Sequence, residues 1–333
     1  RVQSSLTAQL IQKRYIYTMT YKIKQIPEDF IVDEISNVKS NQQGRFLYVE
    51  VKKKNRNTLD VVKELAKQLK IPLNKIGFAG SKDKHAITTQ LFSIANCNQS
   101  KLKEVNIDNV TLKFLGYGNE PITLGDLEGN RFTVTVRNLN KIPEGKIDFC
   151  ENYFDEQRFS KNNKQVGEFI VRKQFKEAVE LLELPVTQNN YVGSLQKIPK
   201  RLSKLYVHSY QSYLFNQSLQ QYVKNGKKVE YSLGTFIFGD KKEDIKLPLP
   251  GFGVEIQDQQ ILKKENITLN DFIIKQFPEL SMEGTFRDAY VKVKEFSIET
   301  ENDELNNGKK KAIVKFILPK SCYATIVIKK LFA

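Results

Sequence analysis

The sequence Gly77-Phe-Ala-Gly-Ser-Lys-Asp-Lys-His-Ala-Ile-Thr-Thr-Gln90 contains a glycine-bounded turn, a carboxylate between two lysines and the start of an apolar stretch. The run from Ile87 to Ile94 predicts a strand directly after the turn. Lys82 and Lys84 place positive charge beside Asp83 and would keep its carboxylate ionised. An ionised carboxylate before a strand suits a nucleophile or a general base, and a surface salt-bridge cluster is the structural alternative.

The segments on either side of this turn predict a mixed α+β arrangement. Residues 58–70 read as a helix, with Thr58 as a possible cap, an apolar face at helical spacing, and Pro72 as its stop. Strands are predicted before and after it, at residues 20–54, 110–117 and 131–137. The first 140 residues are therefore expected to form a sheet with helical connections.

The middle of the chain has a different pattern. Helices are predicted over residues 166–184 and 204–224, a loop over 299–311, and strands at Ala312 to Leu318 and Tyr323 to Ile328. A helix-rich middle between strand-rich ends indicates an inserted domain. We therefore expect an N-terminal extension (1–18), a first catalytic part (19–149), an inserted domain (150–297) and a second catalytic part (298–333).

The N-terminus lacks acidic residues up to Pro27. Such a stretch could be a transit peptide. The alternation that begins at Met19 is instead typical of a first strand, so residues 1–18 are interpreted as an upstream extension.

The charge balance restricts the partners. The 333 residues include 53 Lys and Arg and 38 Asp and Glu, for a net charge of +15. This excess favours a polyanion such as RNA, DNA or a membrane surface, although a basic soluble enzyme is equally compatible with it. Three cysteines and two histidines are scattered without metal-ligand spacing, which predicts neither a zinc site nor a disulfide framework and favours the cytoplasm. No apolar run reaches the length of a membrane span.

Five segments, in one order along the chain, carry a family resemblance. They are Pro27-Glu-Asp-Phe-Ile-Val32 with Glu34, the segment from Gly80 to Gln90, Gly129-Asn-Arg-Phe132, Asn152-Tyr-Phe-Asp-Glu-Gln-Arg-Phe159, and Leu318-Pro-Lys-Ser-Cys-Tyr-Ala-Thr325. Together they resemble the motifs of the TruD family of pseudouridine synthases, in which the second segment holds the catalytic aspartate. Asp155, Ser160 and Ser321 stand where the family has glycine, which affects loop shape where φ is positive or backbones approach closely.

The resemblance implies a pseudouridine-synthase-like catalytic domain with a mixed or antiparallel sheet, interrupted by a TRUD-type α+β domain. It implies that Asp83 is catalytic and that Phe30, Asn130 and Tyr323 contact the target uridine, with Phe132 beside or beneath the base. Lys82 completes the expected substrate-binding set. An enzyme that acts on one RNA base must hold that base by stacking and by hydrogen bonds to its edge. A lone Phe on a strand is, however, more often a core residue.

The sequence is therefore interpreted as a tRNA pseudouridine synthase that isomerises uridine, as the family does at position 13 of tRNA. We expect no cofactor, no metal and no membrane partner, and a monomer. The alternative is a non-catalytic RNA-binding protein that uses the same basic and aromatic surface. A metal-dependent nuclease is a weaker third reading, because Asp29, Asp33 and Asp83 are scattered in sequence.

Overall fold

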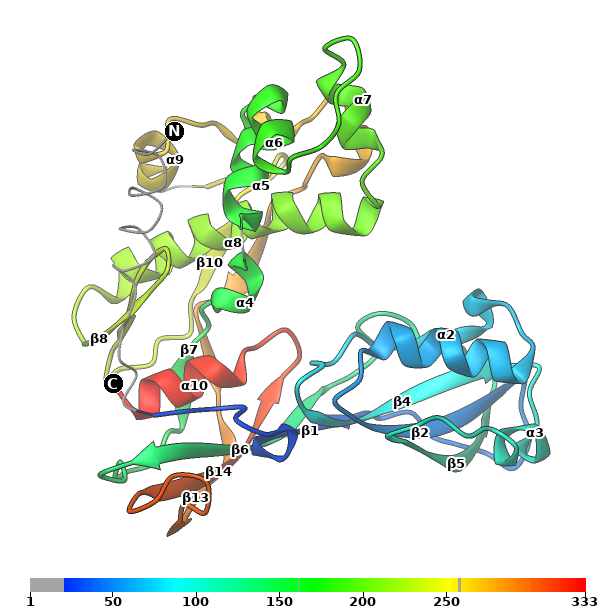
Figure 1. The fold of residues 1–333 in the computed structure, drawn as a ribbon. Helices are drawn as coiled ribbons and strands as arrows, with labels where there is room; N and C mark the ends of the chain where they lie inside the picture. The colour runs from blue at the N-terminus through cyan, green and yellow to red at the C-terminus, as the bar shows by residue number, and fades with distance from the viewer. Residues whose placement is uncertain (1–20, 161, 257–258) are drawn as a thin grey trace, which may run out of the picture. The chain divides into compact units, whose positions relative to one another are not determined.

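The computed structural model describes residues 21–160, 162–256 and 259–333. These residues divide into two compact units (Figure 1). The sheet unit comprises residues 21–148 and Lys292–Ser321, and the helical unit comprises Phe149–Val291 and Cys322–Ala333. The expected N-terminal extension and the start of a strand at Met19 lie outside the described residues.

An eight-stranded mixed sheet forms the sheet unit. Seven strands follow the order β13-β14-β6-β1-β4-β2-β5, and β3 pairs with β4. β1 and β4 run parallel, whereas the other pairs are antiparallel. The strands are β1 (Phe30–Ile35), β2 (Phe46–Lys54), β3 (Ile76–Phe78), β4 (Ile87–Ala95), β5 (Val110–Gly118), β6 (Gly129–Leu139), β13 (Lys294–Asn302) and β14 (Lys310–Pro319). The α+β expectation is confirmed, and the sheet unites segments far apart in the chain.

Helix α2 (Thr58–Leu69) packs on one face of this sheet. Its buried residues recur at helical spacing and share a core with alternate residues of β2 and β4. The helix ends where Lys70 takes a left-handed conformation, with φ of 54°, before Pro72. Asn57, not Thr58, occupies the N-cap position, and the Thr58 hydroxyl is used elsewhere. Short helices complete the unit, namely η1 (Pro27–Asp29), η2 (Leu73–Lys75) and α3 (Gln99–Lys103).

The helical unit is built around α8 (Lys200–Val223), which confirms the helix predicted over 204–224. Gly167 of α5 lies so close to α8 that a Cβ atom there would be 1.9 Å from the Tyr206 carbonyl oxygen. The remaining helices are α4 (Glu156–Phe159), α5 (Asn163–Val171), α6 (Phe175–Leu181), α7 (Tyr191–Gln196), α9 (Gln260–Lys264), η3 (Leu269–Phe272), η4 (Pro278–Leu280) and α10 (Ala324–Leu331). Three strand pairs, β7–β12, β8–β9 and β10–β11, complete the unit, formed by β7 (Phe149–Glu151), β8 (Lys227–Tyr231), β9 (Gly234–Phe238), β10 (Lys246–Leu249), β11 (Thr285–Asp288) and β12 (Tyr290–Lys292).

Three predicted elements differ from those in the structure. The segment from Tyr323 to Ile328 is the start of helix α10, not a strand. The helix expected over 166–184 is broken into α5 and α6, because Lys173 between them has φ of 61°. The loop expected over 299–311 is shorter than predicted and spans 303–309, since β13 extends to Asn302 and β14 starts at Lys310.

The compact units differ from the expected domains at two places. Residues 292–297, expected in the inserted domain, group with the sheet unit. Residues Cys322–Ala333 group with Phe149–Val291, whereas the sequence had placed 298–333 in a single part. Helix α10 explains the second difference, because Lys329 and Lys330 pair with Asp155 and Glu151 of the helical unit. The functional domain boundaries stay a prediction.

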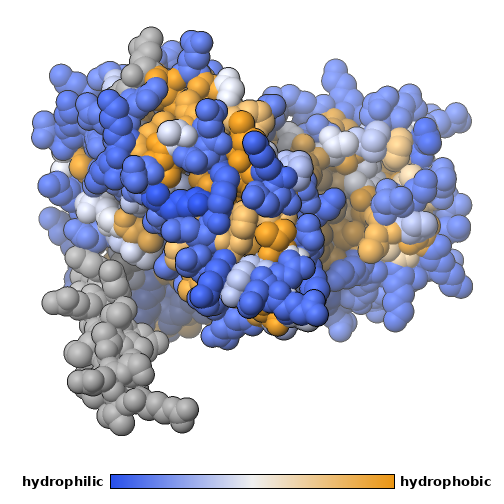
Figure 2. Space-filling model, turned by 90° about the horizontal axis from the view of Figure 1, so that it is seen from above, coloured by the Kyte–Doolittle hydropathy of each residue, from blue (hydrophilic) through white to orange (hydrophobic). Residues whose placement is uncertain are grey.

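Hydrophilic residues cover most of the face shown in Figure 2, and hydrophobic residues gather there in smaller groups. Within the described ranges, none of the helices combines the length and the apolar character that crossing a bilayer requires.

Candidate active site

Asp83 lies on the loop that joins β3 to β4, and side-chain hydrogen bonds hold this loop. The Lys82 backbone N–H donates to the Thr58 hydroxyl over 3.0 Å, and that hydroxyl donates to the Gln90 amide oxygen over 3.1 Å. The Gln90 amide nitrogen donates to the Gly80 carbonyl over 2.9 Å. Because Thr58 and Gln90 are buried, these bonds tie the loop to α2 and β4 without competition from water.

The Asp83 carboxylate pairs with Lys24, which the sequence analysis did not identify. Lys24 Nζ lies 2.8 Å from Asp83 Oδ2, and the two side chains are 24% and 21% exposed. The same ammonium lies 4.0 Å from the centre of the Phe30 ring, within cation–π range. Of the two lysines expected to face Asp83, Lys82 pairs with another carboxylate and Lys84 is exposed.

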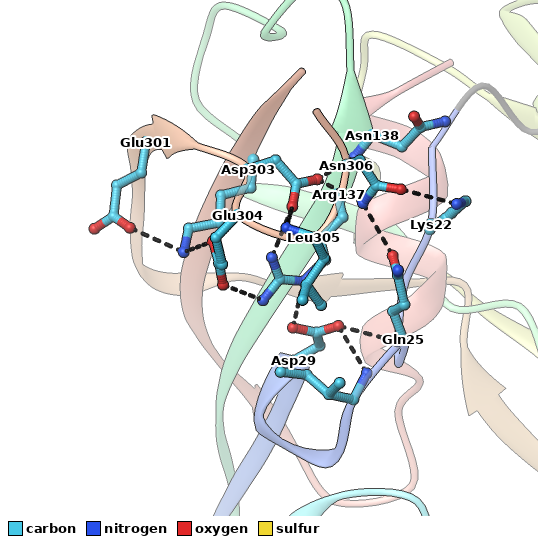
Figure 3. Close-up of polar contacts among 12 residues, drawn as sticks. Lys22, Gln25, Asp29, Arg137, Asn138, Glu301, Asp303, Glu304, Leu305 and Asn306 are labelled. Atoms are coloured by element: carbon cyan, nitrogen blue, oxygen red, sulfur yellow. Dashed lines mark hydrogen bonds and ion pairs between the residues drawn. The ribbon is translucent and has the colours of Figure 1, made fainter. Parts of the chain in front are cut away.

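The segment that carries Lys24 is held at both ends (Figure 3). Lys22 and Arg137 exchange backbone hydrogen bonds of 2.9 and 2.8 Å. Beyond Lys24, the Asp29 carboxylate accepts from the Gln25 backbone N–H at 2.9 Å and from Arg137 Nε at 2.7 Å. Lys24 itself adopts φ of 56°, so the chain turns sharply there and the side chain reaches Asp83.

Arg137 is the centre of this buried network. It also donates to Asp303 over 2.9 Å and to Glu304 over 3.0 Å (Figure 3). Burial acts to raise the pKa of Asp303, but hydrogen bonds from Asn138, Asn306, Leu305 and Arg137 outweigh it and lower that pKa to about 2. Arg137 thereby joins β6, the loop between β13 and β14, and the segment that positions Lys24.

A second lysine, Lys53 on β2, contacts the backbone of the Asp83 loop. Its side chain is buried, with the residue 1% exposed. Lys53 Nζ donates to the main-chain carbonyl oxygens of Asp83 and Arg56, both over 2.7 Å. Burial lowers the pKa of Lys53 to about 8, the Asp83 charge opposes this shift, and the Lys82 charge adds to it. Lys53 therefore fixes the backbone of the residue whose side chain Lys24 holds.

The side chain of Lys82 contacts both strand β1 and strand β6. Its ammonium lies 2.8 Å from Glu34 Oε2 and donates to the Asn130 amide oxygen over 2.6 Å. Glu34 and Asn130 are direct partners in the β1–β6 ladder, which places their side chains on one face. At Gly129, a Cβ atom would lie 2.3 Å from the Leu318 carbonyl oxygen, so the close approach of β14 requires glycine there. With its oxygen occupied, Asn130 can offer its amide NH₂ to a ligand.

Phe30 and Phe132 lie on this same face but are buried. They are 3% and 6% exposed, and their rings meet edge-to-face with centroids 6.2 Å apart. Phe132 also stacks on Phe316 at 5.5 Å. Both rings are thus part of the core beneath Lys24 and Asn130.

Tyr323 belongs to the helical unit, whereas the other predicted site residues belong to the sheet unit. It precedes the first residue of α10 and packs edge-to-face on Phe154, with ring centroids 6.0 Å apart. Burial raises the pKa of Tyr323, although Arg158 and Arg287 act in the opposite direction. That Tyr323 contacts the uridine on which Asp83 acts stays a prediction.

The hydrogen bonds of the two histidines involve neither the Asp83–Lys24 pair nor Arg137. His85 is exposed, with Nδ1 3.1 Å from the Asn55 amide oxygen. His208 lies on α8, with Nδ1 3.0 Å from the Gln211 amide oxygen. Across the described part of the chain, no three His, Cys, Asp or Glu side chains are grouped as metal ligands.

Comparison with known proteins identifies the family. The family model of tRNA pseudouridine synthase D (TruD) matches residues 14–185, 180–248 and 237–331. The chain is 32% identical to the probable tRNA pseudouridine synthase D 2 of Methanocaldococcus jannaschii, over 96% of this chain and 93% of the relative. It is 30% identical to the tRNA pseudouridine synthase D of Aquifex aeolicus, over 94% and 98% of the two chains.

A solved structure shows the same fold. The putative tRNA pseudouridine synthase D of Methanosarcina mazei superposes with a TM-score of 0.69, at 28% identity over 93% of each chain. The α+β fold with its mixed eight-stranded sheet is thus shared with this solved structure. The chain belongs to the TruD family of tRNA pseudouridine synthases, which are isomerases.

Proposed function

We propose that this protein converts a uridine of tRNA to pseudouridine and that Asp83 is the essential catalytic group. The observation that carries this proposal is the setting of Asp83. Its carboxylate lies 2.8 Å from Lys24 Nζ, and its backbone carbonyl accepts from the buried Lys53 over 2.7 Å. A partly exposed carboxylate on a rigid loop can reach a substrate without losing its orientation.

The reaction breaks the bond between N1 of uracil and C1′ of ribose and forms a bond between C5 and C1′. The proton on C5 is lost and N1 gains one, so no redox partner is consumed. Asp83 can serve in two ways. It either attacks the sugar or base to form a covalent intermediate, or it removes a proton from the sugar. In both, the positive charge of Lys24 lies beside the carboxylate in the free enzyme.

The proposed uridine pocket uses the residues around this loop. Asn130 donates its amide NH₂ to a uracil carbonyl oxygen, and Lys82 keeps the amide in that orientation. Phe30 and Phe132 contact the uridine at the edge of the core that they form, and Tyr323 supplies a stacking face. In this proposal residues 150–297 form the inserted domain, and the target is uridine 13 of tRNA, as in the family.

The decisive experiment is the substitution Asp83→Asn, which keeps size and hydrogen-bonding capacity but removes the charge. We expect pseudouridine formation in transcribed tRNA to be lost, while tRNA binding stays equal to wild type or improves slightly. Asp33→Asn is the matched control, because Asp33 lies on β1 between the site-facing positions and points to the other face.

The two measurements separate the candidate functions. A non-catalytic RNA-binding protein predicts binding without product in the wild type. Retained product formation in Asp83→Asn would refute the central assignment, whatever its effect on binding.

A further inference from the structure

The loop between β13 and β14 contributes a buried carboxylate, Asp303, to which the chemistry described above assigns no role. The residue is 5% exposed. Its two carboxylate oxygens accept hydrogen bonds over 2.8–3.0 Å from Arg137, Leu305, Asn138 and Asn306 (Figure 3). These bonds use the acceptor sites of the carboxylate and hold its pKa at about 2 against the opposing effect of burial. Asp303 is therefore a charged and fully bonded anchor.

Arg137 links this anchor to a second buried carboxylate. Its Nη1 donates to Asp303 Oδ1 over 2.9 Å, and its Nε donates to Asp29 Oδ1 over 2.7 Å. All three side chains are buried, so water competes little for these bonds. Because the donors of a guanidinium lie at fixed angles in one plane, the bond to Asp303 determines how Arg137 presents Nε to Asp29.

Asp29 in turn holds the backbone directly after Lys24. Its Oδ2 accepts from the backbone N–H groups of Gln25 over 2.9 Å and of Ile26 over 3.1 Å. Lys24 has φ of 56°, a left-handed conformation that is uncommon for a residue with a long side chain. The contact of 2.8 Å between Lys24 Nζ and Asp83 Oδ2 depends on this turn. The bonds of Asp29 therefore stabilise the conformation from which Lys24 reaches Asp83.

We propose that Asp303 is a positioning residue for the reaction, which acts through Arg137 and Asp29 on Lys24 and thereby on the Asp83 carboxylate. The inference rests on the proposed function, in which Asp83 is the catalytic group. All five residues belong to the sheet unit, so the chain of contacts lies within one compact body.

The test is a double-mutant cycle of Asp303→Asn with Lys24→Met, measured as kcat and KM on transcribed tRNA. Asn keeps the size of the side chain but places an NH₂ group where the carboxylate accepts hydrogen bonds. We expect kcat to fall about three- to tenfold in Asp303→Asn, the equivalent of one hydrogen bond, with little change in KM. In the Lys24→Met background the same substitution should change kcat less than about twofold, because the group through which Asp303 acts is already lost.

Glu301→Gln is the matched control. It removes a carboxylate charge from the same hairpin at an exposed position, where Glu301 pairs with Lys311. This variant should keep the wild-type kcat in both backgrounds.

A milder variant keeps the test valid if Asp303→Asn fails to fold. Asn306→Ala removes one bond to Asp303 and the exposed bonds to Lys22 and Gln25, and it leaves the buried ion pairs intact. We expect kcat to fall about two- to threefold, again only where Lys24 is present. Lys22→Met loses its exposed bond to Asn306 and should keep the wild-type kcat.

Hydrogen exchange gives a readout that does not depend on activity. In the protein without RNA, the backbone amides of residues 22–29 should exchange faster in Asp303→Asn and Asn306→Ala than in the wild type or Glu301→Gln. Mass spectrometry of the corresponding peptide measures this rate, and thermal unfolding verifies that each variant is folded.

The outcomes separate a positioning role from a purely structural one. A folded Asp303→Asn variant with wild-type kcat would overturn the inference. So would a fall in kcat by the same factor in both backgrounds, because the network would then only stabilise the sheet unit. If the wild type formed no pseudouridine, the proposed function would fail by itself, and the exchange of residues 22–29 would still decide whether Asp303 holds the segment that carries Lys24.

Discussion

Lys24 and Asp83 are 59 positions apart in the sequence, and their ion pair is the residue-scale feature on which the proposed chemistry depends. Both side chains are partly exposed, so solvent weakens the attraction between their charges. The Lys24 ammonium also lies against the Phe30 ring, which shields it on one side. A lysine in this position stabilises the charged form of the carboxylate in the free enzyme and during proton transfer.

Replacing Lys24 by Met should therefore lower kcat about 10- to 100-fold, the equivalent of one charged hydrogen bond, with a smaller change in KM. Lys24→Arg should recover most of the lost activity. Lys22→Met, two positions earlier, is the control, because the Lys22 ammonium donates to Asn306 and not to Asp83. Steady-state kinetics on transcribed tRNA check this, and unchanged kcat in Lys24→Met would contradict the role assigned to the pair.

The three positions where the family has glycine differ in backbone conformation. Ser321 has φ of 65°, in the left-handed region where a side chain costs about 1–2 kcal/mol. Asp155 has φ of −91° and caps α4, and its carboxylate pairs with the buried Lys329. Ser160 has φ of −44°, which any residue can adopt. The loss of glycine therefore carries a conformational cost at Ser321 alone of the three.

Substitution by glycine should have opposite effects at two of these positions. Ser321→Gly should raise the free energy of unfolding by about 0.5–1 kcal/mol, since relief of the left-handed strain exceeds the added entropy of the unfolded chain. Asp155→Gly should lower it by about 3–5 kcal/mol, because Lys329 would be left buried without a partner. Thermal or denaturant unfolding measures both, and a shared sign would show that one of these accounts is wrong.

The sequence made Asp83 the candidate catalytic residue but did not point to Lys24 as its ion-pair partner, for a physical reason. Asp83 belongs to a contiguous turn and strand, and local patterns describe such segments well. The position of Lys24 depends on its left-handed backbone and on Arg137, which holds the segment from a distant strand. No short-range pattern contains that information.

At the scale of elements, local propensity misled the prediction for α10. Ile326, Val327 and Ile328 are β-branched and favour a strand, yet the segment is helical because burial of these residues and the ion pairs of Lys329 and Lys330 stabilise it. The sheet was better predicted, since the alternation of Phe132, Val134 and Val136 matches β6. The order of its strands could not be predicted, because it depends on pairing between distant segments.

The contact between strand β2 and the Asp83 loop gives a pH prediction. Lys53 has a pKa of about 8 in the folded protein and an ordinary value of 10.5 when unfolded. Between these values the unfolded chain binds more protons, so folding becomes more favourable as pH rises from about 8 to 10.5. Burial of the charged Lys53 should cost about 3 kcal/mol below pH 8, a cost that disappears above pH 10.5.

Comparing the wild type with Lys53→Met isolates this contribution, because titration of the exposed lysines cancels in the difference. We expect the stability of the wild type relative to Lys53→Met to increase by that amount between pH 7 and 10.5. Denaturant unfolding at a series of pH values measures it. If the free energies of unfolding of the two proteins changed in parallel with pH, the pKa of Lys53 would not be lowered in the folded protein.

At the scale of the whole molecule, the net charge of +15 acts on a partner at longer range than any single contact. Several ion pairs of the sheet unit are exposed, such as Lys315 with Glu299 and Arg131 with Glu295, and contribute little to stability. The positive excess is thus available to a polyanion over a distance set by the ionic strength.

Binding of tRNA should therefore weaken steeply with salt. Each phosphate that the protein neutralises releases condensed counterions, so log K falls linearly with log salt. Contact with about six phosphates would reduce the affinity about 10³-fold between 50 and 200 mM salt. Filter binding or fluorescence anisotropy measures the slope. Asp83→Asn should have a slope as steep as the wild type, because the change removes a negative charge and no phosphate contact. A flat salt response in the wild type would mean that tRNA is recognised without the basic surface, and would contradict the electrostatic argument from which the nucleic-acid partner was first inferred.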